Sequence, residues 1–161
     1  FGRLDPVTGF SAMLASPPFF FESWGGVKEW QGFLYAHQGN GTTGFARYEL
    51  ATNTWSLLPA IPGGAVLGST IDPTSGDYVT YGSYGGTTLY RYSFDQGTWT
   101  VSTIPFFPVS DGGLAWIPAP LPGVYFVQGE IGTGFARTVS TIDCLIADLA
   151  APSTIPWSPA Q

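Results

Sequence analysis

Charged side chains are scarce in this chain. They make up 10% of its 161 residues, well below the quarter or so that is typical of soluble domains. Only five residues are Lys or Arg, and the formal net charge is −6. This balance argues against an electrostatic hold on nucleic acid or on anionic membranes, so polyanions are poor candidate partners.

Cysteine and histidine are almost absent as well. The one cysteine, Cys144, excludes an intrachain disulfide, and with a single histidine, His37, no zinc site of the Cys/His type can be assembled. A metal or other cofactor is therefore not expected.

Uninterrupted apolar runs are also missing. The longest apolar stretch, residues 113–126, is broken by Pro118, Pro120 and Pro122, a density that a membrane-spanning helix would not tolerate. No membrane span is expected. The sequence opens at Phe1 with neither an initiator Met nor a leader peptide, which predicts a processed product or part of a longer polypeptide.

Glycine, proline, serine and threonine are plentiful, and they separate short apolar runs in a repeating order. The pentapeptide Thr43-Gly44-Phe45-Ala46-Arg47 recurs unchanged at residues 133–137. The four arginines of the chain, Arg3, Arg47, Arg91 and Arg137, are separated by 44, 44 and 46 positions. A fixed period of this length indicates a repeat architecture.

The clearest copy of the repeat runs from Val66 to Thr103. Its apolar runs are Val66–Ile71, Tyr78–Tyr81, Thr88–Phe94 and Trp99–Thr103, divided by segments rich in Gly, Asp and Ser. This pattern predicts four short antiparallel strands joined by hairpins. Four such strands in roughly 45 residues are typical of a propeller blade.

The repeat resembles the kelch family. Shared features are an apolar strand ending in Tyr-Gly or Gln-Gly, a glycine-rich loop, an aromatic-Arg-Tyr strand, a polar turn and then Thr-Trp. The Gly-Gly pair of the strict family signature is displaced to Gly85-Gly86 in one copy and missing from the others. Residues 93–99 also resemble the Asp-box of sialidase propellers, although they are one residue short of its spacing. Both resemblances imply a β-propeller.

The predicted fold is therefore an all-β propeller of which about three and a half blades are visible, spanning residues 1–149. Residues 1–14 match only the last two strands of a blade. The complete units are residues 25–59, 64–105 and 112–149, and the proline-rich residues 150–161 form a C-terminal extension. Propellers usually need four to eight blades to close, so we expect further sequence or a protein partner to complete the ring.

Most of the conspicuous side chains are better explained by the repeat than by function. The four arginines are expected to pair with acids or cap carbonyls between blades, and Trp55 and Trp99 are expected to pack against the adjacent blade. Cys144 aligns with Thr54 and Thr98, which argues against a nucleophile. Galactose oxidase, a copper enzyme on a kelch scaffold, needs two histidine ligands, whereas this chain has only His37.

The loops that share one face of a propeller are the better candidates for a contact site. Aromatic residues lie on them beside prolines, and clustered aromatics on loops suit carbohydrate stacking or protein docking. The candidate contact residues are Phe19, Phe20, Phe21, Tyr84, Phe106 and Phe107.

The leading hypothesis is a non-catalytic structural and binding module of an extracellular or virion assembly, because low charge and rigid Gly/Thr/Tyr-rich β structure are common there. The contact would be with a protein or a glycan. Two alternatives stay open: a fragment of a propeller enzyme that acts on glycans, and an intracellular kelch-type interaction domain. No catalytic residue is assigned.

Overall fold

The computed structural model describes residues 1–64, 68–82 and 87–103, and the backbone of four further strands between residues 113 and 145. Every regular element in these residues is a β-strand. The described part contains no helix with the length and apolar character needed to cross a membrane. The prediction of an all-β chain is confirmed.

The strands form one hairpin followed by three four-stranded antiparallel sheets, each with its strands in chain order. The hairpin pairs β1 (Gly2–Leu4) with β2 (Ser11–Met13). The sheets are β3 (Gly26–Trp30), β4 (Phe33–His37), β5 (Phe45–Glu49) and β6 (Thr54–Leu57); β7 (Ser69–Asp72), β8 (Asp77–Tyr81), β9 (Thr88–Ser93) and β10 (Thr98–Thr103); and β11 (Gly113–Ile117), β12 (Gly123–Val127), β13 (Phe135–Thr138) and β14 (Cys144–Leu145).

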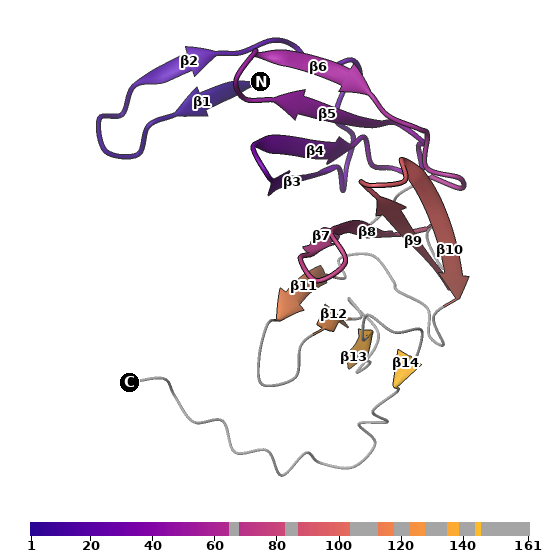
Figure 1. Cartoon of the computed structure of the whole chain (residues 1–161). Helices are drawn as coiled ribbons and strands as arrows, with labels where there is room; N and C mark the ends of the chain where they lie inside the picture. The colour runs from indigo at the N-terminus through magenta and orange to yellow at the C-terminus, as the bar shows by residue number, and fades with distance from the viewer. Residues whose placement is uncertain are drawn as a thin grey trace, which may run out of the picture.

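The hairpin and the sheets follow one another along an arc (Figure 1). The first strand of each sheet lies on the inner side of this arc, where β7 contacts both β3 and β11. The last strands, such as β6 and β10, lie on the outer side. Successive sheets therefore meet along their first strands and spread apart outward.

The β1–β2 hairpin has the same register as the outer two strands of the next two sheets. Arg3 lies opposite Ala12, Arg47 opposite Ser56 and Arg91 opposite Thr100. In each turn, the N–H of a residue with positive φ donates to the carbonyl four positions earlier. These pairs are Gly9 with Asp5, Asn53 with Glu49, and Gly97 with Ser93.

The last sheet departs from this register by one residue. Arg137 lies opposite Leu145, eight positions later, so that Cys144 faces Thr138. Trp55 and Trp99 hold the corresponding position opposite Tyr48 and Tyr92. The alignment of Cys144 with two threonines, expected from the sequence, is wrong because the β13–β14 connection is one residue shorter.

Counting the β1–β2 hairpin as the first structural unit and each sheet as a further one, an aromatic core fills the space between the second unit (β3–β6) and the third (β7–β10). The ring of Phe45, on β5, lies 5.0 Å from Tyr78, 5.1 Å from Tyr92 and 4.9 Å from Trp99, all on the following sheet. Aromatic pairs in such tilted and edge-on geometries contribute about 0.5–1.5 kcal/mol each beyond the burial of their area. Aromatic packing between these two sheets therefore contributes to the core.

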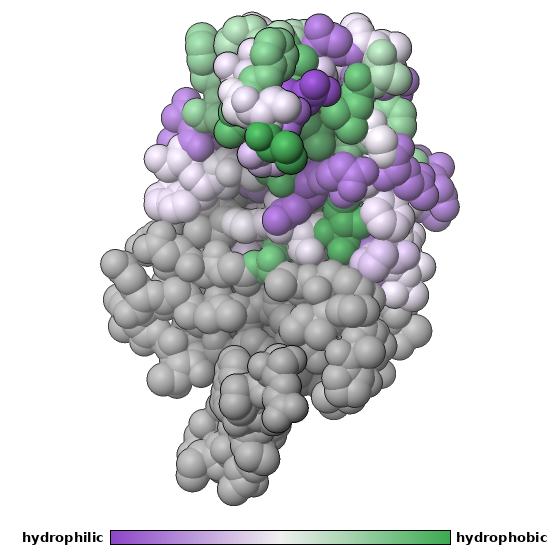
Figure 2. All heavy atoms as spheres, turned by 90° about the vertical axis from the view of Figure 1, so that its left-hand side faces the viewer, coloured by the Kyte–Doolittle hydropathy of each residue, from purple (hydrophilic) through white to green (hydrophobic). Residues whose placement is uncertain are grey.

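The hairpin end of the molecule exposes apolar side chains. Figure 2 shows them gathered at the upper end, where β1 and β2 lie in Figure 1, above a band of hydrophilic residues. Those that belong to the hairpin are Leu4, Val7, Phe10 and Met13.

Candidate functional site

Three of the aromatic residues expected to make contacts, Phe19, Phe20 and Phe21, lie on the connection between β2 and β3. We call residues 19–24 the aromatic loop. Phe20 is 88% exposed, and Phe21 and Trp24 are 39% and 40% exposed. Phe19 is half-buried and stacks edge-on against Phe21, with ring centroids 5.7 Å apart. The loop therefore presents three exposed aromatic side chains supported by a fourth.

The aromatic loop is held by the connection between β4 and β5, residues 38–44, which we call the glycine loop. The backbone N–H of Glu22 donates to the Gln38 carbonyl at 2.9 Å, and that of Asn40 donates to the Ser23 carbonyl at 2.9 Å. One of these bonds is donated by the aromatic loop and the other by the glycine loop, so each loop holds the other. The aromatic loop is thus braced rather than free, and a braced loop loses less entropy in any contact than a free one.

Close backbone contact between the loops requires glycine at position 39. Gly39 has a φ of 92°, a conformation that side chains rarely adopt, and an added Cβ would lie 2.5 Å from the Ser23 carbonyl oxygen. It would also meet the backbone of Gly25. A larger residue here would push the two loops apart.

Trp24 is held in an unusual backbone conformation. Its φ of 65° falls in the left-handed region, which is a genuine outlier for a bulky residue and persists only when the surroundings enforce it. The Gly25 N–H closes a turn around Trp24 by donating to the Glu22 carbonyl at 3.1 Å, and Nε2 of His37 lies 3.0 Å from the Trp24 carbonyl oxygen. The aromatic loop is therefore anchored to a buried side chain of β4.

His37 also links its sheet to the next one. It is fully buried, and its Nδ1 lies 2.6 Å from the hydroxyl of Tyr78 on β8. Because the Trp24 carbonyl can only accept, Nε2 carries the proton and Nδ1 accepts from the tyrosine hydroxyl. Burial lowers the pKa of His37 from 6.5 to about 4, so the ring is neutral at physiological pH.

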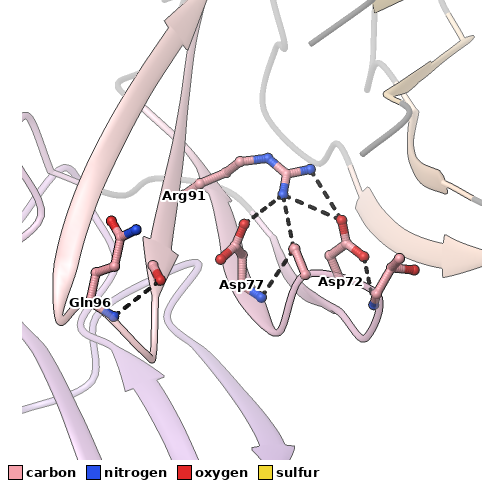
Figure 3. Close-up of polar contacts among 7 residues, drawn as sticks. Asp72, Asp77, Arg91 and Gln96 are labelled. Carbon is pink, nitrogen blue, oxygen red and sulfur yellow. Dashed lines mark hydrogen bonds and ion pairs between the residues drawn. The ribbon is translucent and has the colours of Figure 1, made fainter. Parts of the chain in front are cut away.

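The repeated arginines have different neighbours. Arg91 lies between two carboxylates, 3.0 Å from Asp77 and 3.3 Å from Asp72 (Figure 3). Arg47 holds its guanidinium 5.0 Å from the centre of the Phe33 ring, and Arg3 is exposed. Arg137 lies on β13, and its side chain is outside the described residues. Arg47 and Arg91 thus engage residues of their own sheets, and the described arginines do not form one cluster.

The two tryptophans make equivalent contacts with the preceding structural unit. The Trp55 indole N–H donates to the Ala15 carbonyl at 2.9 Å, and that of Trp99 donates to the Pro59 carbonyl at 2.8 Å. Both acceptors lie 40 positions earlier, just after the outermost strand of the preceding unit. Each tryptophan therefore joins two neighbouring units.

Three of the predicted contact residues fall outside the described residues, namely Tyr84, Phe106 and Phe107. Within the described ranges, no three His, Cys, Asp or Glu residues come together as potential metal ligands.

No protein-family model matches the sequence, and no curated protein shows significant similarity to it. The chemistry of the described residues therefore carries the functional argument.

Two members of the candidate site were not predicted from the sequence. Trp24 lacks the neighbouring phenylalanines that made residues 19–21 conspicuous, and Asn40 stands among glycines and threonines. One of the bonds between their loops joins Ser23 and Asn40, which are 17 positions apart. Self-alignment of the repeat gives no signal for such contacts, because they depend on how one loop lies on another.

Proposed function

We propose that this chain is a non-catalytic binding and assembly module of an extracellular or virion structure, built from kelch-like propeller blades. Its aromatic loop contacts a glycan or a partner protein. The observation that carries the proposal is the set of exposed aromatic side chains on a braced loop.

The blade arrangement is supported by how the sheets meet. Each four-stranded sheet is formed by one continuous segment, and its first strand lies against the first strand of its neighbour. The indole bonds of Trp55 and Trp99 tie the outer parts of successive units in the same way. Radial repetition of four-stranded sheets around an axis is the organisation of a propeller.

The contact role is supported by the chemistry of the loop surface. Phe20 is almost fully exposed, and Phe21 and Trp24 on the same loop are partly exposed. Burying such rings against a ligand is strongly favourable, and aromatic residues are enriched at binding surfaces. The exposed Asn40 on the adjoining loop adds polar groups that can fix the orientation of a ligand. Flat apolar rings beside an amide suit the apolar faces and hydroxyl groups of a neutral sugar.

The non-catalytic assignment is supported by the surroundings of two carboxylates that share one arginine. Asp72 and Asp77 lie directly opposite each other on β7 and β8, the kind of pair that a glycosidase would use. However, the Asp72 side chain is fully buried, and Arg91 bonds to both residues. The pair is therefore committed to holding the hairpin together.

The proposal is tested by binding of the purified chain to a glycan array. Phe20→Ser is the informative variant because this side chain is 88% exposed, so its loss should leave folding unchanged. We expect glycan binding to fall at least tenfold, as about 1.4 kcal/mol of lost contact energy would produce. Val101→Ser is the matched control, because Val101 is an exposed apolar residue on β10, outside the loop.

Three outcomes would contradict parts of the proposal. Equal losses in both variants would mean that the loop has no special role. Absence of glycan binding, together with no cross-link from a photoreactive group at position 20 to any component of the native assembly, would remove the contact role. Hydrolysis of a glycoside by the purified chain would overturn the non-catalytic assignment.

A further inference from the structure

The strand β1 has an open backbone edge. It pairs only with β2 in a two-stranded sheet, and no other described strand lies beside it. Phe1 and Asp5 direct backbone groups at β2, since the Phe1 carbonyl accepts from Leu14 and the Asp5 N–H donates to Phe10. Alternate residues of an antiparallel strand direct their backbone groups to opposite sides. Gly2 and Leu4 therefore offer theirs to the open edge.

The repeat shows what covers this edge in other units. β5 and β9 hold the position of β1 in their sheets, and each is paired on that edge with the preceding strand, β4 or β8. The residues equivalent to Gly2 and Leu4 are Ala46 and Tyr48, which lie opposite Ala36 and Leu34. An antiparallel strand is thus the expected neighbour of β1.

Side-chain exposure singles out the same place. Leu4 is 65% exposed, whereas its equivalents Tyr48 and Tyr92 are 1% and 4% exposed. Met13, also on the hairpin, is 83% exposed, but its equivalents Leu57 and Val101 are exposed too. The exposure of Met13 is therefore an ordinary property of the repeat, while that of Leu4 marks an incomplete contact.

The residues equivalent to Leu4 in the next two units show what should lie over its side chain. Tyr48 is covered by Phe1 of the preceding unit, at a centroid distance of 5.0 Å, and Tyr92 by Phe45 of the unit before it, at 5.1 Å. The equivalent cover for Leu4 is an aromatic ring from a further unit. Both the edge and the face thus lack the material that one more repeat supplies.

We propose that the edge of β1 binds an antiparallel strand pair with the chemistry of β3–β4, in the register that β4 takes on β5. The bound strand places a small residue opposite Gly2 and a leucine-like residue opposite Leu4. Its neighbouring unit covers Leu4 with an aromatic ring. This is strand addition, in which backbone hydrogen bonds give affinity and alternating side chains give specificity.

A second copy of the chain is not the proposed occupant. The sheets β3–β6, β7–β10 and β11–β14 each use all four of their strands in their own pairing. Within the described residues, none of these sheets has a strand pair free to bind the β1 edge of another copy. The proposed occupant is a repeat segment that is not part of residues 1–161.

The experiment uses a peptide with the sequence of residues 25–38, which contains β3, β4 and their two-residue turn. The peptide is added to the full chain, and amide hydrogen exchange is followed by NMR. We expect exchange at Gly2 and Leu4 to slow by about tenfold or more, because exchange rates report on new backbone hydrogen bonds. The Arg3 amide already faces β2, so its exchange should be unchanged.

Two matched controls make the test specific. A peptide carrying Ala36→Pro loses the N–H that would pair with the edge and should not bind. The chain variant Leu4→Pro loses only an N–H that points away from β2, so the hairpin should persist while peptide binding disappears. Retention of the β1–β2 hairpin is checked by the exchange of Arg3.

Three results would overturn the proposal. One is unchanged exchange at Gly2 and Leu4 with saturating wild-type peptide. Another is equal binding of the Ala36→Pro peptide. The third is protection of Gly2 and Leu4 that rises with the concentration of the chain alone, because it would identify a second copy as the occupant. None of these depends on the aromatic loop, so failure here is distinguishable from failure of glycan binding.

Discussion

Removal of Arg91 should destabilise the chain far more than removal of Arg47, although both occupy the same position of the repeat. Arg91 bonds to Asp72 and Asp77, which lie directly opposite each other, and the Asp72 side chain is fully buried. Arg91→Met leaves these carboxylates without a counter-charge. Arg47→Met removes an exposed guanidinium that lies over the Phe33 ring and interacts with the Tyr35 hydroxyl.

The magnitudes follow from the two environments. Breaking a buried ion pair by removing one partner costs about 3–5 kcal/mol. The side chains of Arg91 and Asp77 are 18% and 17% exposed, so solvent screening places the cost at the lower end, about 3 kcal/mol. An exposed cation–π contact such as that of Arg47 contributes about 0.5–1 kcal/mol. For a chain of this size, these losses correspond to decreases in Tm of roughly 6–12 °C and 1–4 °C.

Urea unfolding followed by far-UV circular dichroism measures both variants under the same conditions. The double variant Arg91→Met/Asp72→Asn should recover most of the stability, because the amide keeps the shape of Asp72 and its bond from the Thr74 N–H but carries no charge. Equal destabilisation by Arg91→Met and Arg47→Met would refute the reasoning. So would failure of the Asp72→Asn change to restore stability, since the cost would then come from lost packing rather than unpaired charge.

Three further predictions concern the contacts between units and loops. The free energy of unfolding should decrease by roughly 3 kcal/mol as pH falls from 6.5 to 4. Burial lowers the pKa of His37 to about 4 in the folded chain, so the unfolded chain binds the proton first. Urea unfolding at several pH values should show that His37→Gln loses this pH-dependent component. Gly39→Ala should destabilise the chain by more than Gly76→Ala, since both have positive φ but only Gly39 also lacks space; an equal loss would mean that the loops separate freely. Trp99→Phe should cost about 1 kcal/mol through the lost bond to the Pro59 carbonyl, and an unchanged thermal midpoint would show that water replaces this bond.

The sequence predicts the sheets well because the repeat is local. In the copy from Val66 to Thr103, each predicted strand overlaps an observed one, and the turns fall where Gly, Asp and Pro are concentrated. Period-two alternation and turn residues act within one hairpin, so the sequence expresses them directly. The first strand agrees from Ser69, where β7 begins, and its predicted positions Val66 and Leu67 lie outside the described residues.

The candidate site was predicted only in part, because its geometry depends on contacts between separate segments. The exposure of Phe20 agrees with its place in a loop, whereas the sequence gives no sign that Trp24 adopts a positive φ. The Trp24 carbonyl accepts a hydrogen bond from His37, 13 positions away and on a different element, and this contact is not visible in the sequence. Likewise, the shared repeat position of Arg47 and Arg91 does not reveal that Arg91 pairs with carboxylates while Arg47 lies over an aromatic ring.

The tryptophan bonds between units have a consequence for the order of folding. Each indole donates to a carbonyl 40 residues nearer the amino terminus, so each unit docks onto one that has already left the ribosome. Neither of these two described indole bonds requires a segment that is synthesised after the tryptophan itself. Folding during synthesis can therefore proceed unit by unit from the amino end, with every completed sheet serving as the template for the next.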